Sequence, residues 1–132
     1  MLGETVKKYS NELYALFSLF VGFMFFQHGA GKLFGWFGQS SVMLASLFGV
    51  AGVVEFLVGL ALIFGFFGRL GALLGAVQML VAYVKVHLPN GINPLANGGE
   101  LALLYFAAFL IVLAYGNHNW SLEKKLLGKE QF

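Results

Sequence analysis

The sequence contains no cysteine and no aspartate, and it has only two prolines. The lack of cysteine excludes disulfides, thiolate chemistry, Cys-ligated metal sites and iron–sulfur clusters. Charge is also scarce. Lys, Arg and Glu together make up 11% of the 132 residues, whereas soluble domains average about 25% charged residues. This scarcity places the chain outside the soluble globular class.

Apolar residues make up most of the chain. The chain is 59% hydrophobic, and its mean hydropathy is +0.81. A formal net charge of +2 is too small to indicate a nucleic-acid partner. Basic residues near both ends, with a pI of about 9.0, favour contact with anionic lipid headgroups. The composition therefore indicates a membrane protein whose first partner is lipid.

Four apolar runs have the length of a membrane helix, which is about 20 residues. They predict a single all-α domain over 1–132, with four transmembrane helices in an antiparallel bundle. The expected helices cover residues 13–37, 42–66, 70–88 and 99–116. The expected connections are 38–41, 67–69 and the Pro/Asn/Gly-rich stretch 89–99. The tail 121–132 reads as a short amphipathic helix that Ser121 caps.

The basic residues also predict the orientation of this bundle. With an even number of spans, both termini lie on one side. Six basic residues fall on that side and two on the other, namely Lys32 and Lys85. The positive-inside rule then puts both termini in the cytoplasm and the protein in the cytoplasmic membrane. A soluble four-helix bundle would show charged stripes, and the sequence has none.

Every expected span carries at least one polar or ionisable residue. Because such residues are costly in a bilayer, each is a candidate for function. They are Gln27, His28, Lys32, Glu55, Gln78, Lys85, His87 and Glu100. Structural roles compete with function at several of them. The two glutamines can join helices, the two lysines can extend to the interface, and Glu100 can complement a helix dipole.

Helical spacing predicts which of these side chains face the protein interior. His28 and Lys32 lie four residues apart and share a face. Glu55 and Gln78 each lie on a stripe of small residues of the kind that packs helices closely. These stripes are Ala45, Gly49, Gly52, Glu55, Gly59 and Gly71, Gly75, Gln78, Ala82, Lys85. On the fourth span, Glu100, Ala107 and Ala114 share a face.

These faces predict a polar pocket that opens outward. Glu55 lies near the bilayer midplane and forms the pocket floor, where it must be protonated, paired with a cation, or hydrogen-bonded by groups such as Gln78 or His28. Lys32 and Glu100 are candidates for an ion pair near the mouth. Lys85 and His87 lie about 200° apart on an α-helix. The spacing therefore leaves open which of the two faces the core.

The order of these residues resembles the DoxX family of small four-helix membrane proteins. The resemblance rests on "HGAGKLFG" at residues 28–35, on Glu55 followed by Gly65 and Arg69, and on His87 and Glu100 at helix ends. It closes with "GNHNWSLEKKL" at residues 116–126. Within it, Ser121, Leu122 and Glu123 match a Ser-Leu-acid motif in which aspartate is the commoner acid. The resemblance implies a membrane component of a redox system that uses quinone or quinol, or an accessory protein in oxidative stress or quinone detoxification.

A quinone-linked oxidoreductase component is the first functional hypothesis. His28, Glu55 and Lys32 can supply hydrogen bonds and protons to a quinone, as catalytic residues. The expected ligand-binding residues are Gln78, Lys85, His87 and Glu100. The sequence has no flavin or nicotinamide motif, so electrons would come from a soluble redox partner or a second substrate. A homodimer is a further expectation.

Three alternatives stay open at this stage. A proton-coupled transporter or binder of small molecules would use Glu55 as its exchanging carboxyl. A membrane anchor for a soluble enzyme would need no chemistry. His28 and His87 would be the axial ligands of a haem, or would join Glu55 and Glu100 in a metal site. No metal is expected, because Glu55 lies too deep to share a ligand sphere with His87 and Glu100.

Overall fold

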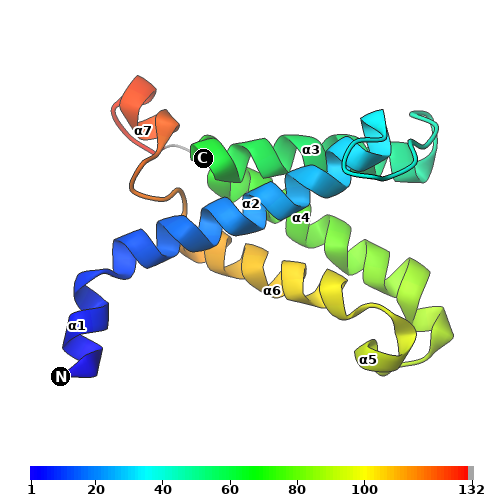
Figure 1. The fold of residues 1–132 in the computed structure, drawn as a ribbon, viewed down its shortest axis with the longest axis horizontal. Coiled ribbons are helices and arrows are strands. Elements are labelled where there is room, and N and C mark those ends of the chain that lie inside the picture. The colour runs from blue at the N-terminus through cyan, green and yellow to red at the C-terminus, as the bar shows by residue number, and fades with distance from the viewer. Residues whose placement is uncertain (131–132) are drawn as a thin grey trace.

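The computed structural model describes residues 1–130, and this part of the chain contains helices and no strand (Figure 1). A π-helical turn at Tyr83–His87 and a 3-10 turn at Leu88–Asn90 extend α4. The α-helices are α1 Leu2–Lys8, α2 Ser10–Phe34, α3 Leu47–Phe64, α4 Gly68–Ala82, α5 Pro94–Asn97, α6 Glu100–Tyr115 and α7 Leu122–Leu127.

Three helical segments are long and apolar enough to cross a membrane: Ser10–Phe34, Leu47–Phe64 and Gly68–Asn90. The fourth apolar helix, α6, is shorter, with 16 residues. Large apolar side chains stay exposed along these helices, including Phe20, Leu57 and Leu104, each about 60% exposed. Such a surface suits a lipid environment, as expected for a membrane protein.

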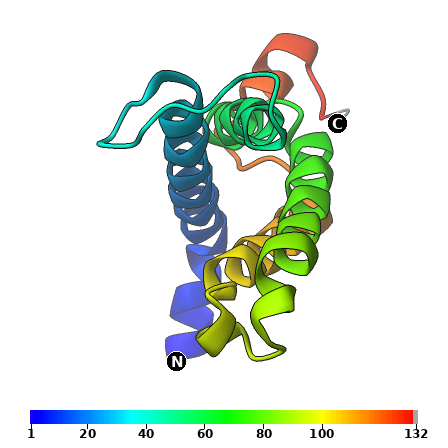
Figure 2. The same cartoon turned by 90° about the vertical axis from the view of Figure 1, so that its right-hand side faces the viewer.

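The helices form two pairs. α2 runs along α3, α4 runs along α6, and α3 joins the pairs by packing on α4. Viewed along the bundle, α2 and α4 lie on opposite sides of a common centre (Figure 2). Phe25 of α2 bridges this centre, because its ring lies 5.0 Å from that of Tyr105 and 4.8 Å from that of Phe109 on α6. α1 and α7 lie towards one end of the bundle, and α5 and the 35–46 loop lie at the other (Figure 1).

Glycines bring the backbones of α2 and α3 into contact. A β-carbon at Gly59 would lie 2.5 Å from the backbone nitrogen of Phe26, and one at Gly22 would lie 2.9 Å from the carbonyl oxygen of Gly59. Neither position can therefore accept a larger residue without moving a helix. The predicted stripe on α3 is confirmed at Gly49, Gly52, Glu55 and Gly59, which are all buried.

The connections differ from those predicted. The first covers residues 35–46, not the tight turn at 38–41, and α3 begins at Leu47 and not at residue 42. Gly35 ends α2 with φ 70°, and Ser46 begins α3 by accepting a hydrogen bond from the Gly49 nitrogen. Apolar composition hid both signals, because residues 42–46 read as part of the span. The helix α1 and the helical turn α5 were not predicted.

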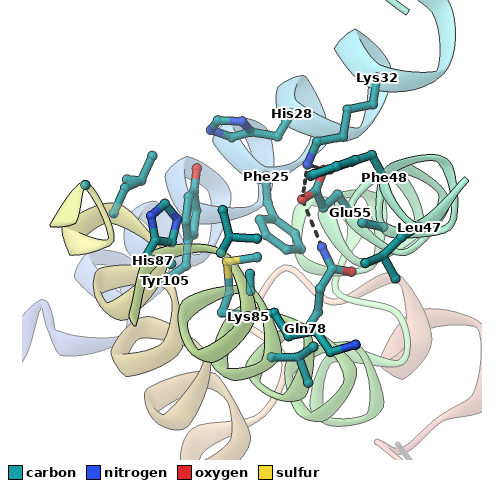
Figure 3. Close-up of a pocket in the computed structure, with 18 residues that line it drawn as sticks. Phe25, His28, Lys32, Leu47, Phe48, Glu55, Gln78, Lys85, His87 and Tyr105 are labelled. Carbon is teal, nitrogen blue, oxygen red and sulfur yellow. Dashed lines mark hydrogen bonds and ion pairs between the residues drawn. The ribbon is translucent and has the colours of Figure 1, made fainter. Parts of the chain in front are cut away.

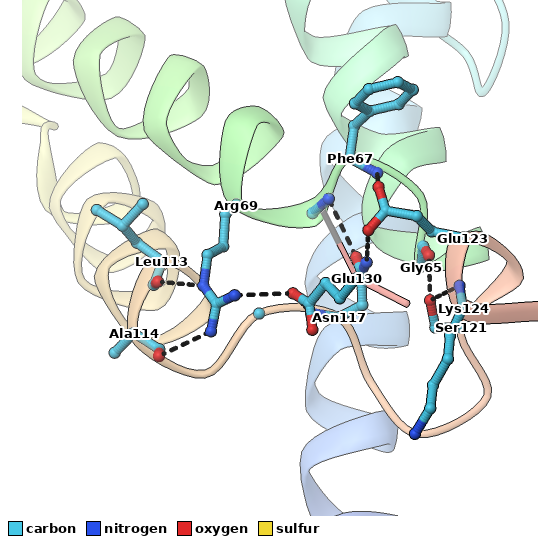
Figure 4. A network of polar contacts seen from close by, with 12 residues as sticks. Gly65, Phe67, Arg69, Leu113, Ala114, Asn117, Ser121, Glu123, Lys124 and Glu130 are labelled. Carbon is cyan, nitrogen blue, oxygen red and sulfur yellow. Dashed lines mark hydrogen bonds and ion pairs between the residues drawn. The ribbon is translucent and has the colours of Figure 1, made fainter. Parts of the chain in front are cut away.

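Hydrogen bonds join residues 116–130, which include the Ser121–Leu122–Glu123 motif, to the turn between α3 and α4 (Figure 4). Ser121 caps α7 as predicted, and its hydroxyl also donates to the Gly65 carbonyl at 2.6 Å. Glu123 is fully buried and accepts hydrogen bonds from Phe67 N and Asn117 Nδ2, each at 3.1 Å. Arg69 donates to the Leu113 and Ala114 carbonyls and to Glu130. Residues 131–132 of the predicted tail lie outside the described residues.

Candidate functional site

A cavity of about 340 Å³ lies among α2, α3, α4 and α6, towards the end that carries α5 (Figure 3). Most of its wall is apolar, with Phe25, Phe48 and Met79 among the lining residues. Seven polar or ionisable side chains also line it: His28, Lys32, Glu55, Gln78, Lys85, His87 and Tyr105. Six of these seven were predicted from the sequence. Five of them form two groups with different hydrogen bonding, and the other two are Lys85 and His87.

The first group is centred on the carboxylate of Glu55, which is only 3% exposed. Lys32 Nζ lies 2.6 Å from Oε1 and 2.7 Å from Oε2, so the lysine bridges both oxygens. Gln78 Nε2 donates to Oε1 at 2.9 Å. The three residues come from α2, α3 and α4. We call this group, Lys32, Glu55 and Gln78, the carboxylate cluster.

A small residue permits this arrangement. A β-carbon at Gly52 would lie 2.9 Å from the β-carbon of Lys32. The absence of a side chain at Gly52, one turn before Glu55, therefore lets Lys32 lie across α3. A buried carboxylate is strongly destabilising unless it is paired and hydrogen-bonded. Lys32 and Gln78 meet both conditions, so the cavity floor is polar but carries no net charge.

The second group consists of His28 and Tyr105. Their rings meet edge to face, with centroids 5.9 Å apart and an interplanar angle of 86°. Neither the imidazole nitrogens of His28 nor the Tyr105 hydroxyl makes a hydrogen bond within residues 1–130. In Figure 3 these two residues lie to one side of the cavity, away from the carboxylate cluster. Their polar atoms are therefore available to a ligand.

Tyr105 was missed at the sequence level. The buried face of α6 consists of Ala102, Tyr105, Phe109 and Val112, and not of Glu100, Ala107 and Ala114. One signal was available, because Tyr105 is the only residue with a polar side chain between positions 101 and 114. Its aromatic ring concealed it among apolar neighbours.

The π-helical turn resolves the question of Lys85 and His87, because both line the cavity. The nitrogen of Leu88 bonds to the Tyr83 carbonyl, five residues earlier, so the turn is wider than an α-helical one. His87 Nδ1 donates to the Asn97 carbonyl at 3.3 Å. The buried Asn97 side chain in turn donates to Tyr83 Oη and the Gly91 carbonyl, which orders the loop above the cavity.

The predicted ion pair between Lys32 and Glu100 is wrong. Lys32 pairs with Glu55, while Glu100 is exposed at the first turn of α6 and does not line the cavity. Lys32 pairs with the buried carboxylate because a buried charge needs a counter-ion, whereas the exposed carboxylate of Glu100 does not. Within residues 1–130, no three His, Asp or Glu side chains gather in a group that could hold a metal ion.

Removal of Lys32 tests the balance of charge in the carboxylate cluster. Lys32→Met leaves Glu55 buried and without a counter-ion, a change that typically destabilises by about 3–5 kcal/mol. We expect a clear fall in the midpoint of thermal unfolding of the purified protein. The double variant Lys32→Met/Glu55→Leu should recover much of that stability, since no charge is left unpaired.

Lys85→Met is the matched control, because Lys85 is exposed and forms no ion pair within residues 1–130. It should unfold close to the wild-type midpoint. A double variant less stable than Lys32→Met alone would contradict the account of the pair.

Comparison with known proteins identifies the family of the chain. A sequence profile of the DoxX family matches residues 15–88, which include α3 and all of the carboxylate cluster. An uncharacterized protein of Haemophilus influenzae is 34% identical and aligns over 96% of this chain and 99% of its own length. No solved structure matches. The chain is therefore a membrane protein of the DoxX family.

Proposed function

We propose that this protein is a membrane component of a quinone-linked redox system and that the cavity binds the quinone headgroup. The observation that carries the proposal is a polar floor without net charge in a cavity whose wall is mostly apolar. A quinone is neutral, planar and mostly apolar, with two carbonyl oxygens that need hydrogen-bond donors. The paired charges of Lys32 and Glu55 attract neither anions nor cations strongly, and Lys32 and Gln78 still offer hydrogen-bond donors.

Reduction of a quinone to a quinol takes up two electrons and two protons. Lys32 and His28 line the cavity and can deliver the protons, while the carboxylate of Glu55 holds the Lys32 ammonium in place. The sequence provides no flavin or nicotinamide motif and no cysteine for an iron–sulfur cluster. We therefore assign electron supply to a soluble redox partner or to a second substrate. The isoprenoid tail would leave between the apolar helices into the lipid.

Proton-coupled transport is a weaker explanation of the same cavity. A carrier of this kind needs Glu55 to release and bind a proton in turn. Both carboxylate oxygens are instead held by Lys32, and one also by Gln78. These contacts support a fixed polar floor rather than an exchanging group.

The proposal also includes the membrane topology. We propose that α6 spans together with the three longer segments, with both termini in the cytoplasm and the cavity in the outer half of the cytoplasmic membrane. α6 has 16 residues, which corresponds to about 24 Å. Its ends would therefore lie inside a hydrocarbon core of about 30 Å. The shared end of α1 and α7 and the basic residues there support this orientation.

The absence of cysteine allows a direct test of topology. Single cysteines at Ile92, in the loop next to α5, and at Gly3, in α1, should react oppositely with a membrane-impermeant maleimide. Ile92 is 85% exposed, and a side chain at Gly3 meets nothing within 4 Å. Intact cells should label Ile92→Cys only, and permeabilised cells should label both. Labelling of Gly3→Cys in intact cells would refute the proposed orientation.

Quinone bound to the purified protein tests the proposed function. We expect quinone to co-purify with the wild type and to be measurable after solvent extraction and chromatography. Glu55→Gln should lower its occupancy, because the charge on Lys32 is then unbalanced. Ala51→Phe should lower the occupancy as well, since Ala51 lines the cavity and the phenyl ring would fill that space.

Ala51→Phe leaves the carboxylate cluster intact, so it separates loss of binding from loss of stability. Glu4→Gln, an exposed change in α1, is the control and should retain wild-type occupancy. Equal quinone content in all four proteins would count against a quinone site in this cavity.

A further inference from the structure

Hydrogen-bond capacity is left over at two places in the cavity. In the carboxylate cluster, a lysine has three N–H donors and an amide group has two. Lys32 uses two of its donors on Glu55, and Gln78 uses one. At least one donor therefore remains on each residue. At the other place, His28 and Tyr105 make no hydrogen bond within residues 1–130.

The two places are carried by neighbouring turns of α2. His28 and Lys32 are four residues apart, which puts their backbones about 6 Å apart along the helix axis. A ring with a carbonyl at each opposite end has two acceptors that point in opposite directions, so it can accept one hydrogen bond at each place. A ring with a single carbonyl has only one such acceptor.

We propose that the cavity selects planar rings with hydrogen-bonding groups at opposite ends, and that Tyr105 is a specificity-determining residue for the end next to His28. The proposal rests on the proposed quinone site and extends it, because it names 1,4-quinones as the ligand class. One carbonyl accepts from Lys32 or Gln78, and the other accepts from Tyr105 Oη or His28.

Tyr105 is suited to this role because its ring cannot move freely. Tyr105 is 5% exposed. Its ring centroid lies 5.0 Å from that of Phe25 and 6.1 Å from that of Phe109. These rings hold the hydroxyl in one position at the cavity wall. A fixed donor of this kind distinguishes ligands better than a mobile one, since little entropy is lost on binding.

Tyr105→Phe tests the proposal, because it removes one hydroxyl and keeps the ring packing. Binding of 1,4-naphthoquinone and of 1-tetralone, which has a single carbonyl, is measured by calorimetry on the full chain in detergent. The quinone does not react with thiols here, since the chain has no cysteine. We expect Tyr105→Phe to weaken 1,4-naphthoquinone binding about three- to tenfold, the range for one hydrogen bond. Tetralone binding should change little, because its carbonyl can turn to Lys32.

Tyr115→Phe is the matched control, since Tyr115 lies on the same helix, is 68% exposed and does not line the cavity. It should bind both compounds as the wild type does. Equal quinone affinity in the wild type and Tyr105→Phe would overturn the role of Tyr105 and leave the proposed quinone site standing. An equal loss for both compounds would also overturn it, because packing alone would then explain the effect. No binding of either compound to the wild type would overturn this proposal and the quinone site together.

Discussion

The ion pair between Lys32 and Glu55 is the interaction on which the rest of the site depends. It joins α2 to α3 with distances of 2.6 and 2.7 Å, inside a bundle whose outer surface is apolar. Close packing makes it possible, because glycines at 29, 52 and 59 let the two backbones approach. The pair in turn explains the cavity, since it places a polar floor without net charge beneath apolar walls. Gln78 links the same carboxylate to α4, so three helices are tied to one group.

The sequence predicted most of the helices but fewer of their ends. Long apolar runs correctly indicated the segments that contain α2, α3, α4 and α6. Their ends depend on single residues, such as Gly35 with its positive φ and the Ser46 cap, and these signals are weak inside an apolar background. The π-helical turn at Tyr83–His87 was also not predicted. It lies beside a loop that Asn97 orders through hydrogen bonds to Tyr83 and Gly91, and contacts of this kind are a tertiary property.

More of the candidate site than of the helix ends could be predicted from the sequence. Rarity was the useful signal, because a charged residue within an apolar span stands out and must have a partner. This reasoning found Glu55, Lys32, His28 and Gln78, which all line one cavity. It named Gln78 as a possible partner of Glu55 correctly. It failed on Lys32, which it paired with Glu100 although the structure pairs it with Glu55, because distance between helices is a tertiary property. It also failed on Tyr105, whose hydroxyl matters only because the fold turns it towards an otherwise apolar space.

The most direct test of this account is the distance between Lys32 and Glu55 in a lipid bilayer. Solid-state NMR on protein labelled with ¹⁵N at lysine Nζ and ¹³C at glutamate Cδ reports such a distance through dipolar dephasing. We expect strong dephasing for one buried glutamate signal, and we expect the same signal to lose its dephasing in Lys32→Met. Identical dephasing curves for the wild type and Lys32→Met would contradict the ion pair and, with it, the balance of charge at the floor of the cavity.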